Sequence, residues 1–200
     1  MRDRQFLRSA MVGLALLVIG VAPAAFAGPA TDQIKPQIER VIATLENPAL
    51  KGESKTAERR QVLRGITDEI FDWTEMAKRS LGRHWAARTP AEQQEFVALF
   101  RELLERAYAA KIERYAGEPI AYVSEVVDGE VTTVRTRITT RQNQEVPIDY
   151  RMFREGDRWR VYDVLIENIS LVNNYRTQFD GIIKTSSYEE LVKRLKARTS

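Results

Sequence analysis

The sequence contains no cysteine and a single histidine in 200 residues. The absence of cysteine excludes a disulfide framework, a thiol nucleophile and a thiolate metal site. With His84 as the one histidine, the usual transition-metal sites, which combine several histidine and cysteine ligands, are excluded as well. The chain also lacks the EF-hand spacing, a glycine-rich phosphate loop and a Gly-x-Ser-x-Gly motif. We therefore expect no metal site and no resident cofactor, and a structural role for His84 in an inter-helix turn.

The first 27 residues have the three-part layout of a secretory signal peptide. Three arginines lie among the first eight residues, and an uncharged run follows over residues 9–27. Ala25 and Ala27 are the small residues at the −3 and −1 positions of a cleavage site. The apolar part is short for a bilayer-spanning helix and ends in helix breakers. We expect residues 1–27 to be removed and residues 28–200 to be exported as one domain; an uncleaved anchor is the alternative.

Residues 28–200 also have no large excess of positive or negative side chains. The full chain has 31 basic and 28 acidic residues, and residues 1–27 hold three of the basic and one of the acidic ones, which leaves 28 against 27. The two signs are interleaved rather than gathered in a basic stripe, so nucleic-acid binding is not expected.

Several segments carry apolar residues at helical spacing. One helix is predicted around residues 34–45, and a second, continuous helix over residues 63–77. A third begins at Thr89, a capping hydroxyl that is followed by proline at the first helical position and glutamate at the third. A second capping box at residues 186–189 opens a final helix.

Strand signals fill the region between the last two of these helices. Residues 120–127 and 131–140 are predicted as a hairpin, because Asp128-Gly129 is a strong turn signal. A third strand contains Ile148, Tyr150 and Met152, and a fourth spans residues 159–171. The order predicts an α+β fold in which helices pack on one face of a curved antiparallel sheet of about four strands. A layer of helices over a strongly curved sheet encloses a cone-shaped space. This space is either filled by side chains or open as a pocket, and the periodicity of the sequence favours neither.

Three aspartates are candidates for a catalytic base in a pocket of this kind. These candidates are Asp72, Asp149 and Asp163, and Asp149 alternates away from the apolar residues of its strand and is expected to face solvent. Asp163 has apolar neighbours on both sides, which favours a buried, hydrogen-bonded structural role. We therefore predict no catalytic residue. The strand that holds Asp163 is apolar on both faces, so it is either covered by helices on both sides or lines an apolar cavity with one of them.

Residues 159–179, WRVYDVLIENISLVNNYRTQF, resemble the C-terminal part of the MlaC family, also called toluene-tolerance proteins. The similarity continues through residues 187–191. Earlier segments agree at residues 71–73 and 77–82, at Trp85 and along the helix over residues 89–115. One departure lies at residues 167–168, where Glu-Asn replaces the more usual acidic residue and glycine.

The resemblance implies a periplasmic, non-enzymatic phospholipid carrier with an NTF2-like sheet and an apolar cavity. It implies one partner in each membrane. The outer-membrane partner is a lipoprotein–porin complex that contains MlaA, and the inner-membrane partner is an ABC transporter that presents the lipid-binding subunit MlaD. Such a carrier serves the lipid asymmetry of the outer membrane, with the bound phospholipid as cargo. A hopanoid-associated carrier of the same family, a pocket enzyme of NTF2-like fold and a periplasmic adaptor with a filled interior are the alternatives.

Alternation and the resemblance together predict the residues that contact lipid. The residues expected from the sheet are Ile148, Tyr150, Met152, Val164, Ile166 and Ile169. The helices are expected to contribute Phe71, Met76, Phe100, Leu103 and Tyr108. The residues expected at the mouth of the cavity are Val172, Tyr175 and Phe179.

Overall fold

A computed structural model describes residues 28–199 of the chain. The predicted signal peptide, residues 1–27, lies outside this range. Within the described range, every helix falls short of the length and apolar character that a bilayer-spanning segment requires.

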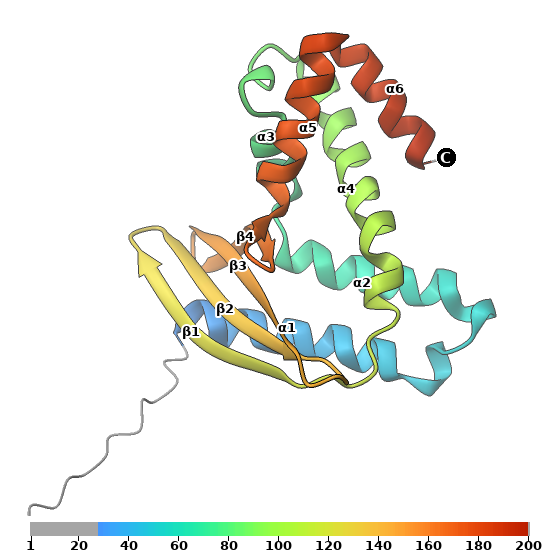
Figure 1. Cartoon of the computed structure of the whole chain (residues 1–200), viewed down its shortest axis with the longest axis vertical. Coiled ribbons are helices and arrows are strands. Elements are labelled where there is room, and N and C mark those ends of the chain that lie inside the picture. The colour runs from blue at the N-terminus through green and yellow to red at the C-terminus, as the bar shows by residue number, and fades with distance from the viewer. Residues whose placement is uncertain (1–27, 200) are drawn as a thin grey trace, which may run out of the picture.

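The described chain combines six α-helices with one antiparallel sheet (Figure 1). Four α-helices precede the sheet and two follow it: α1 (Pro29–Glu46), α2 (Thr56–Ile70), α3 (Trp73–Leu81), α4 (Pro90–Ile112), α5 (Leu171–Thr185) and α6 (Tyr188–Thr199). Short 3-10 turns connect them: η1 (Pro48–Leu50), η2 (Glu53–Lys55) and η3 (Gly82–His84). The sheet is a meander in the order β1-β2-β3-β4-β5: β1 (Ile120–Asp128), β2 (Val131–Thr139), β3 (Glu145–Glu155), β4 (Arg158–Ile166) and β5 (Ile169–Ser170).

Capping chemistry predicts the start of α4 correctly. The Glu92 amide donates to Thr89 Oγ1 at 3.3 Å, and the Thr89 amide donates back to Glu92 Oε2 at 2.7 Å. This reciprocal capping box satisfies two amides that the first helical turn leaves without partners. The final helix, α6, starts one residue later than predicted, because Ser187 rather than Ser186 accepts from a first-turn amide, that of Glu190, at 3.2 Å.

The prediction of one continuous helix over residues 63–77 is wrong. α2 ends at Ile70, Phe71 forms a parallel bridge to Val161 of β4, and α3 starts afresh at Trp73. Asp72 caps α3 by accepting from the Glu75 amide at 2.7 Å. An aspartate at this position favours a helix start over a helix interior. The break brings the Phe71 side chain to the edge of the sheet.

The predicted fourth strand, residues 159–171, is also divided. β4 ends at Ile166, and Glu167 and Asn168 take positive φ angles of 51° and 65°. Two such residues in succession form the tight turn that suits a hairpin, and β5 and α5 follow it. The sheet therefore has five strands, and the last part of the predicted strand belongs to a helix.

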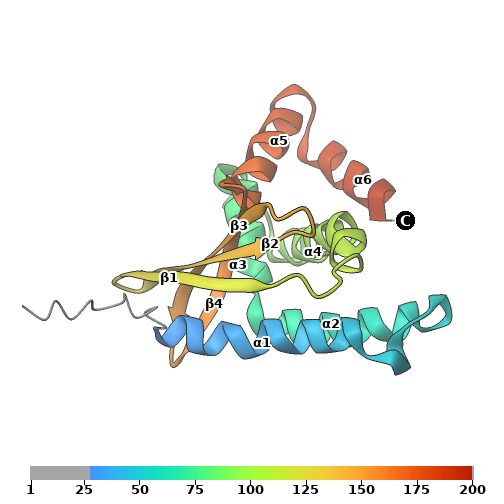
Figure 2. The same cartoon turned by 60° about the horizontal axis from the view of Figure 1, so that its bottom comes forward.

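Helices contact β4 from both of its faces, so the prediction of helices on one face only is corrected. α1 and α2 run along one face, where Val161 and Val164 are buried (Figure 2). On the other face, the Arg79 guanidinium of α3 lies 4.1 Å from the Tyr162 ring, and Asp163 contacts the start of α5. The strand is therefore covered by helices on both sides over its buried part, whereas Ile166 at its end keeps some accessible surface.

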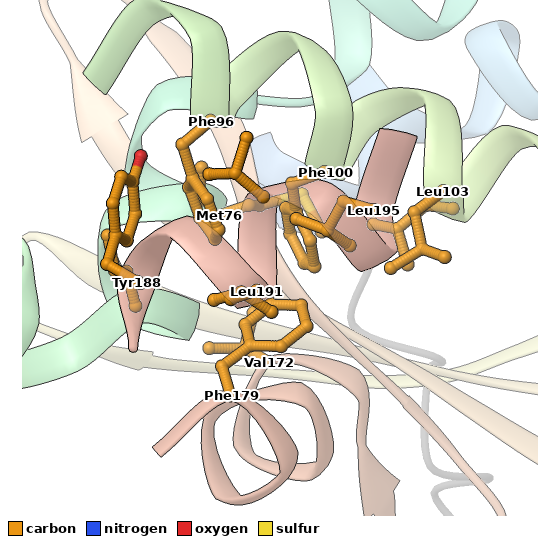
Figure 3. Packing of buried hydrophobic residues seen from close by; sticks show 13 residues of the cluster. Met76, Phe96, Phe100, Leu103, Val172, Phe179, Tyr188, Leu191 and Leu195 are labelled. Atoms are coloured by element: carbon orange, nitrogen blue, oxygen red, sulfur yellow. The ribbon is translucent and has the colours of Figure 1, made fainter. Parts of the chain in front are cut away.

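The buried apolar side chains form two clusters. The first lies among α3, α4, α5 and α6, where Phe96 and Phe100 have no exposed surface and Phe179 meets both rings edge-on (Figure 3). Each aromatic side chain buried in this way contributes about 1.5–3 kcal/mol. The second lies between α1, α2 and the sheet. Phe71 and Tyr108 are only partly buried and pack against both clusters, so the two clusters meet there.

Candidate functional site

Eight apolar side chains around the second cluster are only partly buried, and we call them the seam residues: Ile38, Val41, Phe71, Tyr108, Tyr122, Ile148, Tyr150 and Ile166. They come from α1, α4, three strands and the break between α2 and α3, which are elements far apart in the sequence. Apolar side chains that gather inside a fold without being fully covered are typical of a ligand-binding surface.

The pairing of the strands explains why the seam residues of the sheet lie together. Tyr122 is opposite Thr136, Thr136 is opposite Ile148, and Ile148 is opposite Ile166. Residues directly opposite each other in an antiparallel sheet point to the same face. The four side chains therefore form a row across β1, β2, β3 and β4. Thr136 is buried and its hydroxyl donates to the Ile148 carbonyl at 2.6 Å, so the row presents an apolar surface.

Tyr150 belongs to the neighbouring row, between Val134 and Val164. Burial raises the pKa of Tyr150 to about 12, yet the side chain keeps some accessible surface. Within residues 28–199 the Tyr150 hydroxyl has no hydrogen-bond partner. It is not one of the fully buried polar atoms that lack a partner, so it keeps accessible surface. Polar groups of native proteins normally bond to protein, water or a ligand. The hydroxyl is therefore available to a polar atom of a ligand.

Three more tyrosines share this environment. Burial, followed by the charge of the Tyr150 phenolate, raises the pKa of Tyr122. Burial also raises the pKa of Tyr108, and the charge of Tyr175 raises it further. Tyr175 in turn packs edge-on against Phe100, with ring centroids 5.5 Å apart. The four phenol groups thus form two pairs of neighbours, Tyr122 with Tyr150 and Tyr108 with Tyr175.

A groove of about 410 Å³ separates α2 from α4 at the surface. The apolar residues along it are Ala57, Leu63, Ala109 and Ile112. Ion pairs join the two helices beside it: Arg60 to Glu113 at 3.1 Å, and Arg64 to Glu105. Exposed ion pairs of this kind contribute little to stability, so they present a small barrier to separation of the helices.

The predicted contact residues fall into four groups. The seam residues include five of them: Phe71, Tyr108, Ile148, Tyr150 and Ile166. Two more, Met152 and Val164, are buried in the second cluster. The first cluster contains Met76, Phe100, Leu103, Val172 and Phe179, and the partly buried Tyr175 packs against it. Ile169 stands apart, because it follows the β4–β5 turn and is 63% exposed. Ile38, Val41 and Tyr122 were missed. Their helical or strand character could be read from the sequence, but the strand register that places Tyr122 and Ile148 in one row, on either side of Thr136, could not.

Asp163 has the structural role that its apolar neighbours predict. It is 3% exposed and accepts from Ser170 Oγ at 2.6 Å and from the Val172 amide at 3.1 Å, with Arg151 Nη1 at 3.4 Å. Its carboxylate therefore anchors the start of α5 to β4, where negative charge stabilises the helix N-terminus.

The other polar candidates are also engaged in structural contacts. Asp72 caps α3, and Asp149 pairs with Arg135 at 3.8 Å. His84 Nε2 lies 2.9 Å from Asp180 Oδ1, in the turn where it was expected. Over the part of the chain that the structure describes, no group of three or more His, Cys, Asp or Glu side chains is arranged to hold a metal ion.

Comparison with known proteins gives consistent matches. The family model "MlaC protein" matches residues 35–197. A curated relative, the intermembrane phospholipid transport system binding protein MlaC of Haemophilus influenzae, is 25% identical over 125 residues; the match covers 60% of this chain and 58% of the relative's length. Among solved structures, a phospholipid-binding protein of Ralstonia solanacearum, determined in complex with a phospholipid, matches with a TM-score of 0.77 and 26% identity over 85% of this chain and 96% of that chain.

Proposed function

Since this chain belongs to the MlaC family, whose model matches residues 35–197, we propose that it is a carrier that binds a phospholipid. The observation that carries the proposal is the set of partly accessible apolar seam residues inside the fold, together with the similarity to a protein solved with a bound phospholipid.

The physical need for such an interior follows from the chemistry of the cargo. A two-tailed phospholipid has about 30 methylenes, and each costs about 0.8 kcal/mol to expose to water. Free diffusion of the lipid through water therefore faces a penalty of more than about 20 kcal/mol. A carrier must replace the bilayer with an apolar surface of its own, whereas the phosphate can stay near water. Recognition of the tails then dominates the affinity.

We place the acyl chains along the seam residues, between the two apolar clusters. Phe71 and Tyr108 pack against both clusters from the side, so a hydrocarbon chain that separates the clusters would contact these two rings first. Ile148 and Ile166 would contact its length from the sheet. The Tyr150 hydroxyl, which has no hydrogen-bond partner within residues 28–199, would donate to an ester or phosphate oxygen. The groove between α2 and α4 is our candidate for the path by which the tails enter.

The transport route is part of the same proposal. We propose that residues 1–27 are removed on export, that residues 28–200 form one domain in the periplasm, and that the carrier exchanges lipid with an outer-membrane MlaA–porin complex and with the MlaD subunit of an inner-membrane ABC transporter. This exchange would maintain the lipid asymmetry of the outer membrane. The name of the H. influenzae relative, a binding protein of an intermembrane phospholipid transport system, supports this route.

Native mass spectrometry of the purified mature chain tests the proposal. We expect a large fraction of the protein to carry one or more phospholipid masses, which extraction and tandem mass spectrometry would identify. Protein without bound lipid, under conditions that preserve weak complexes, would favour an adaptor with a filled interior. An extracted hopanoid would assign the chain to the other carrier branch. A turnover that Asp163→Asn abolishes while the fold is kept would favour an enzyme.

A further inference from the structure

α5 packs beside α3 (Figure 1) and contacts η3. A pocket lies between these elements, separate from the groove between α2 and α4. Its volume is about 350 Å³, and Gly82, Arg83, His84, Arg176 and Asp180 are among the residues that line it. Asp180 is the one acidic residue among the described residues of this lining. The pocket contains none of the seam residues.

The Asp180 carboxylate is already surrounded by donors. It accepts from Arg83 Nη2 at 2.6 Å and from Lys184 Nζ at 2.8 Å, and it lies 2.9 Å from His84 Nε2. The hydrogen bond from Lys184, followed by that from His84, holds the pKa of Asp180 well below its usual range. The carboxylate is therefore ionised, and its single negative charge is shared by two cationic side chains and an imidazole.

Arg176 adds a cation that has no partner. It is exposed, and within residues 28–199 it makes no hydrogen bond or ion pair. Its stem lies against Gly82: a β-carbon at this glycine would be 3.2 Å from Arg176 Cδ. Gly82 also has a φ of 58°, which favours glycine. The glycine thus lets the Arg176 stem lie close to η3 and directs the arginine toward the pocket.

The local charge balance is positive in a chain that is otherwise nearly balanced. Three positive charges lie here, on Arg83, Arg176 and Lys184, against one negative charge on Asp180. Residues 28–200 as a whole carry 28 basic and 27 acidic side chains. Guanidinium groups bind phosphate oxygens through pairs of charge-assisted hydrogen bonds. We propose that this pocket binds a phosphate group, from a lipid headgroup at a membrane surface or from a free phosphate ester, at a position distinct from the acyl-chain site.

Two titrations of the mature protein test the proposal and distinguish the two sources. In the first, inorganic phosphate is added at low salt and the amide and arginine side-chain NMR signals are followed. In the second, the protein is sedimented with vesicles of phosphatidylcholine that contain phosphatidylglycerol, and with vesicles of phosphatidylcholine alone. We expect saturable shifts at Gly82, Arg83 and Arg176 with phosphate. Sedimentation with anionic vesicles only would identify a lipid headgroup as the source, and phosphate shifts without vesicle binding would identify a free phosphate ester.

Arg176→Gln is the diagnostic variant, because this exposed side chain makes no hydrogen bond or ion pair that folding needs. Loss of one charge-assisted contact should weaken binding about tenfold. Arg114→Gln on the exposed surface removes the same charge elsewhere and should change binding less than about twofold, since distant exposed charges are screened. Native mass spectra of Arg176→Gln should retain bound lipid. Any one of three results would overturn the proposal. These are equal effects of the two variants on binding, no binding of either phosphate or anionic vesicles, and loss of the co-purified lipid in Arg176→Gln.

Discussion

Gly28 lies directly against the Glu125 carboxylate, so that a β-carbon at this position would be 2.4 Å from Glu125 Oε1. Glu125 Oε2 accepts from the Thr31 amide at 2.7 Å and from Thr31 Oγ1 at 2.6 Å, and Oε1 accepts from the Ala30 amide at 3.3 Å. The carboxylate thus joins β1 to the first turn of α1, where a negative charge is favourable. A bulge between Tyr122 and Ser124 turns Glu125 to the same face of the sheet as Tyr122. This anchor holds α1 beside the seam residues.

Glu125→Gln should therefore lower the free energy of unfolding by about 1–2 kcal/mol, through loss of the charge at the helix start. Gly28→Ala should produce a similar loss, because the added methyl group displaces the same carboxylate. The two changes share one mechanism, so the double variant should cost less than the sum of the single ones. Urea unfolding measures all three. Glu130→Gln, an exposed change in the β1–β2 turn, is the control, and additive losses at positions 28 and 125 would contradict the shared anchor.

Export should leave Gly28 as the first residue of the mature protein. Ala25 and Ala27 supply the small side chains that the cleavage site needs, and the described helix α1 begins directly after Gly28, at Pro29. Intact mass and N-terminal sequencing of protein from the periplasmic fraction measure the start. Ala27→Arg should block cleavage and leave the precursor at the membrane. Exported protein that retains residues 1–27 would contradict the prediction.

Alkaline pH should destabilise the protein through Tyr150. The native state keeps this proton to about pH 12, whereas an unfolded tyrosine loses it near pH 10. Between about pH 10 and 12 the unfolded state binds fewer protons, so the free energy of unfolding falls as pH rises, by at most about 2–3 kcal/mol for this group. Tyr150→Phe should remove that part of the loss. Urea unfolding between pH 8 and 11.5 measures this loss of unfolding free energy, with Tyr162→Phe as the control. Identical pH profiles of stability for Tyr150→Phe and wild type would refute the role of Tyr150.

Filling the seam should expel lipid without unfolding the protein. Ile148→Trp adds bulk in the middle of the row across the sheet, at a position that is only partly buried. We expect the fraction of protein with bound lipid, measured by native mass spectrometry, to fall several-fold. Val164→Trp should act in the same direction at a higher cost in stability, because Val164 is 7% exposed and overpacking a core costs about 1–3 kcal/mol. Ile169→Trp, at the exposed turn, is the matched control. Equal lipid content in all four proteins would show that the cargo lies elsewhere.

Local chemistry predicts the parts of this fold that depend on neighbouring residues. The Thr89 capping box and the Asp128-Gly129 hairpin follow from short patterns, and both are confirmed. The start of α5 also had local signals, since Ser170 is a capping residue and Val172, Tyr175 and Phe179 have helical spacing, but the run of strand-forming residues before it concealed them. The seam could not be predicted in full, because it depends on strand register and on the packing of α1 and α4, which no short pattern encodes.

Photo-crosslinking tests the central claim most directly. A phospholipid with a diazirine at the middle of one acyl chain is loaded into the mature protein, irradiated, and mapped by peptide mass spectrometry. Crosslinks at Ile148, Tyr150, Ile166 and Tyr108 are the result that an acyl chain along the seam residues predicts. Crosslinks confined to the outer groove between α2 and α4, or to the exposed Ile169, would contradict it.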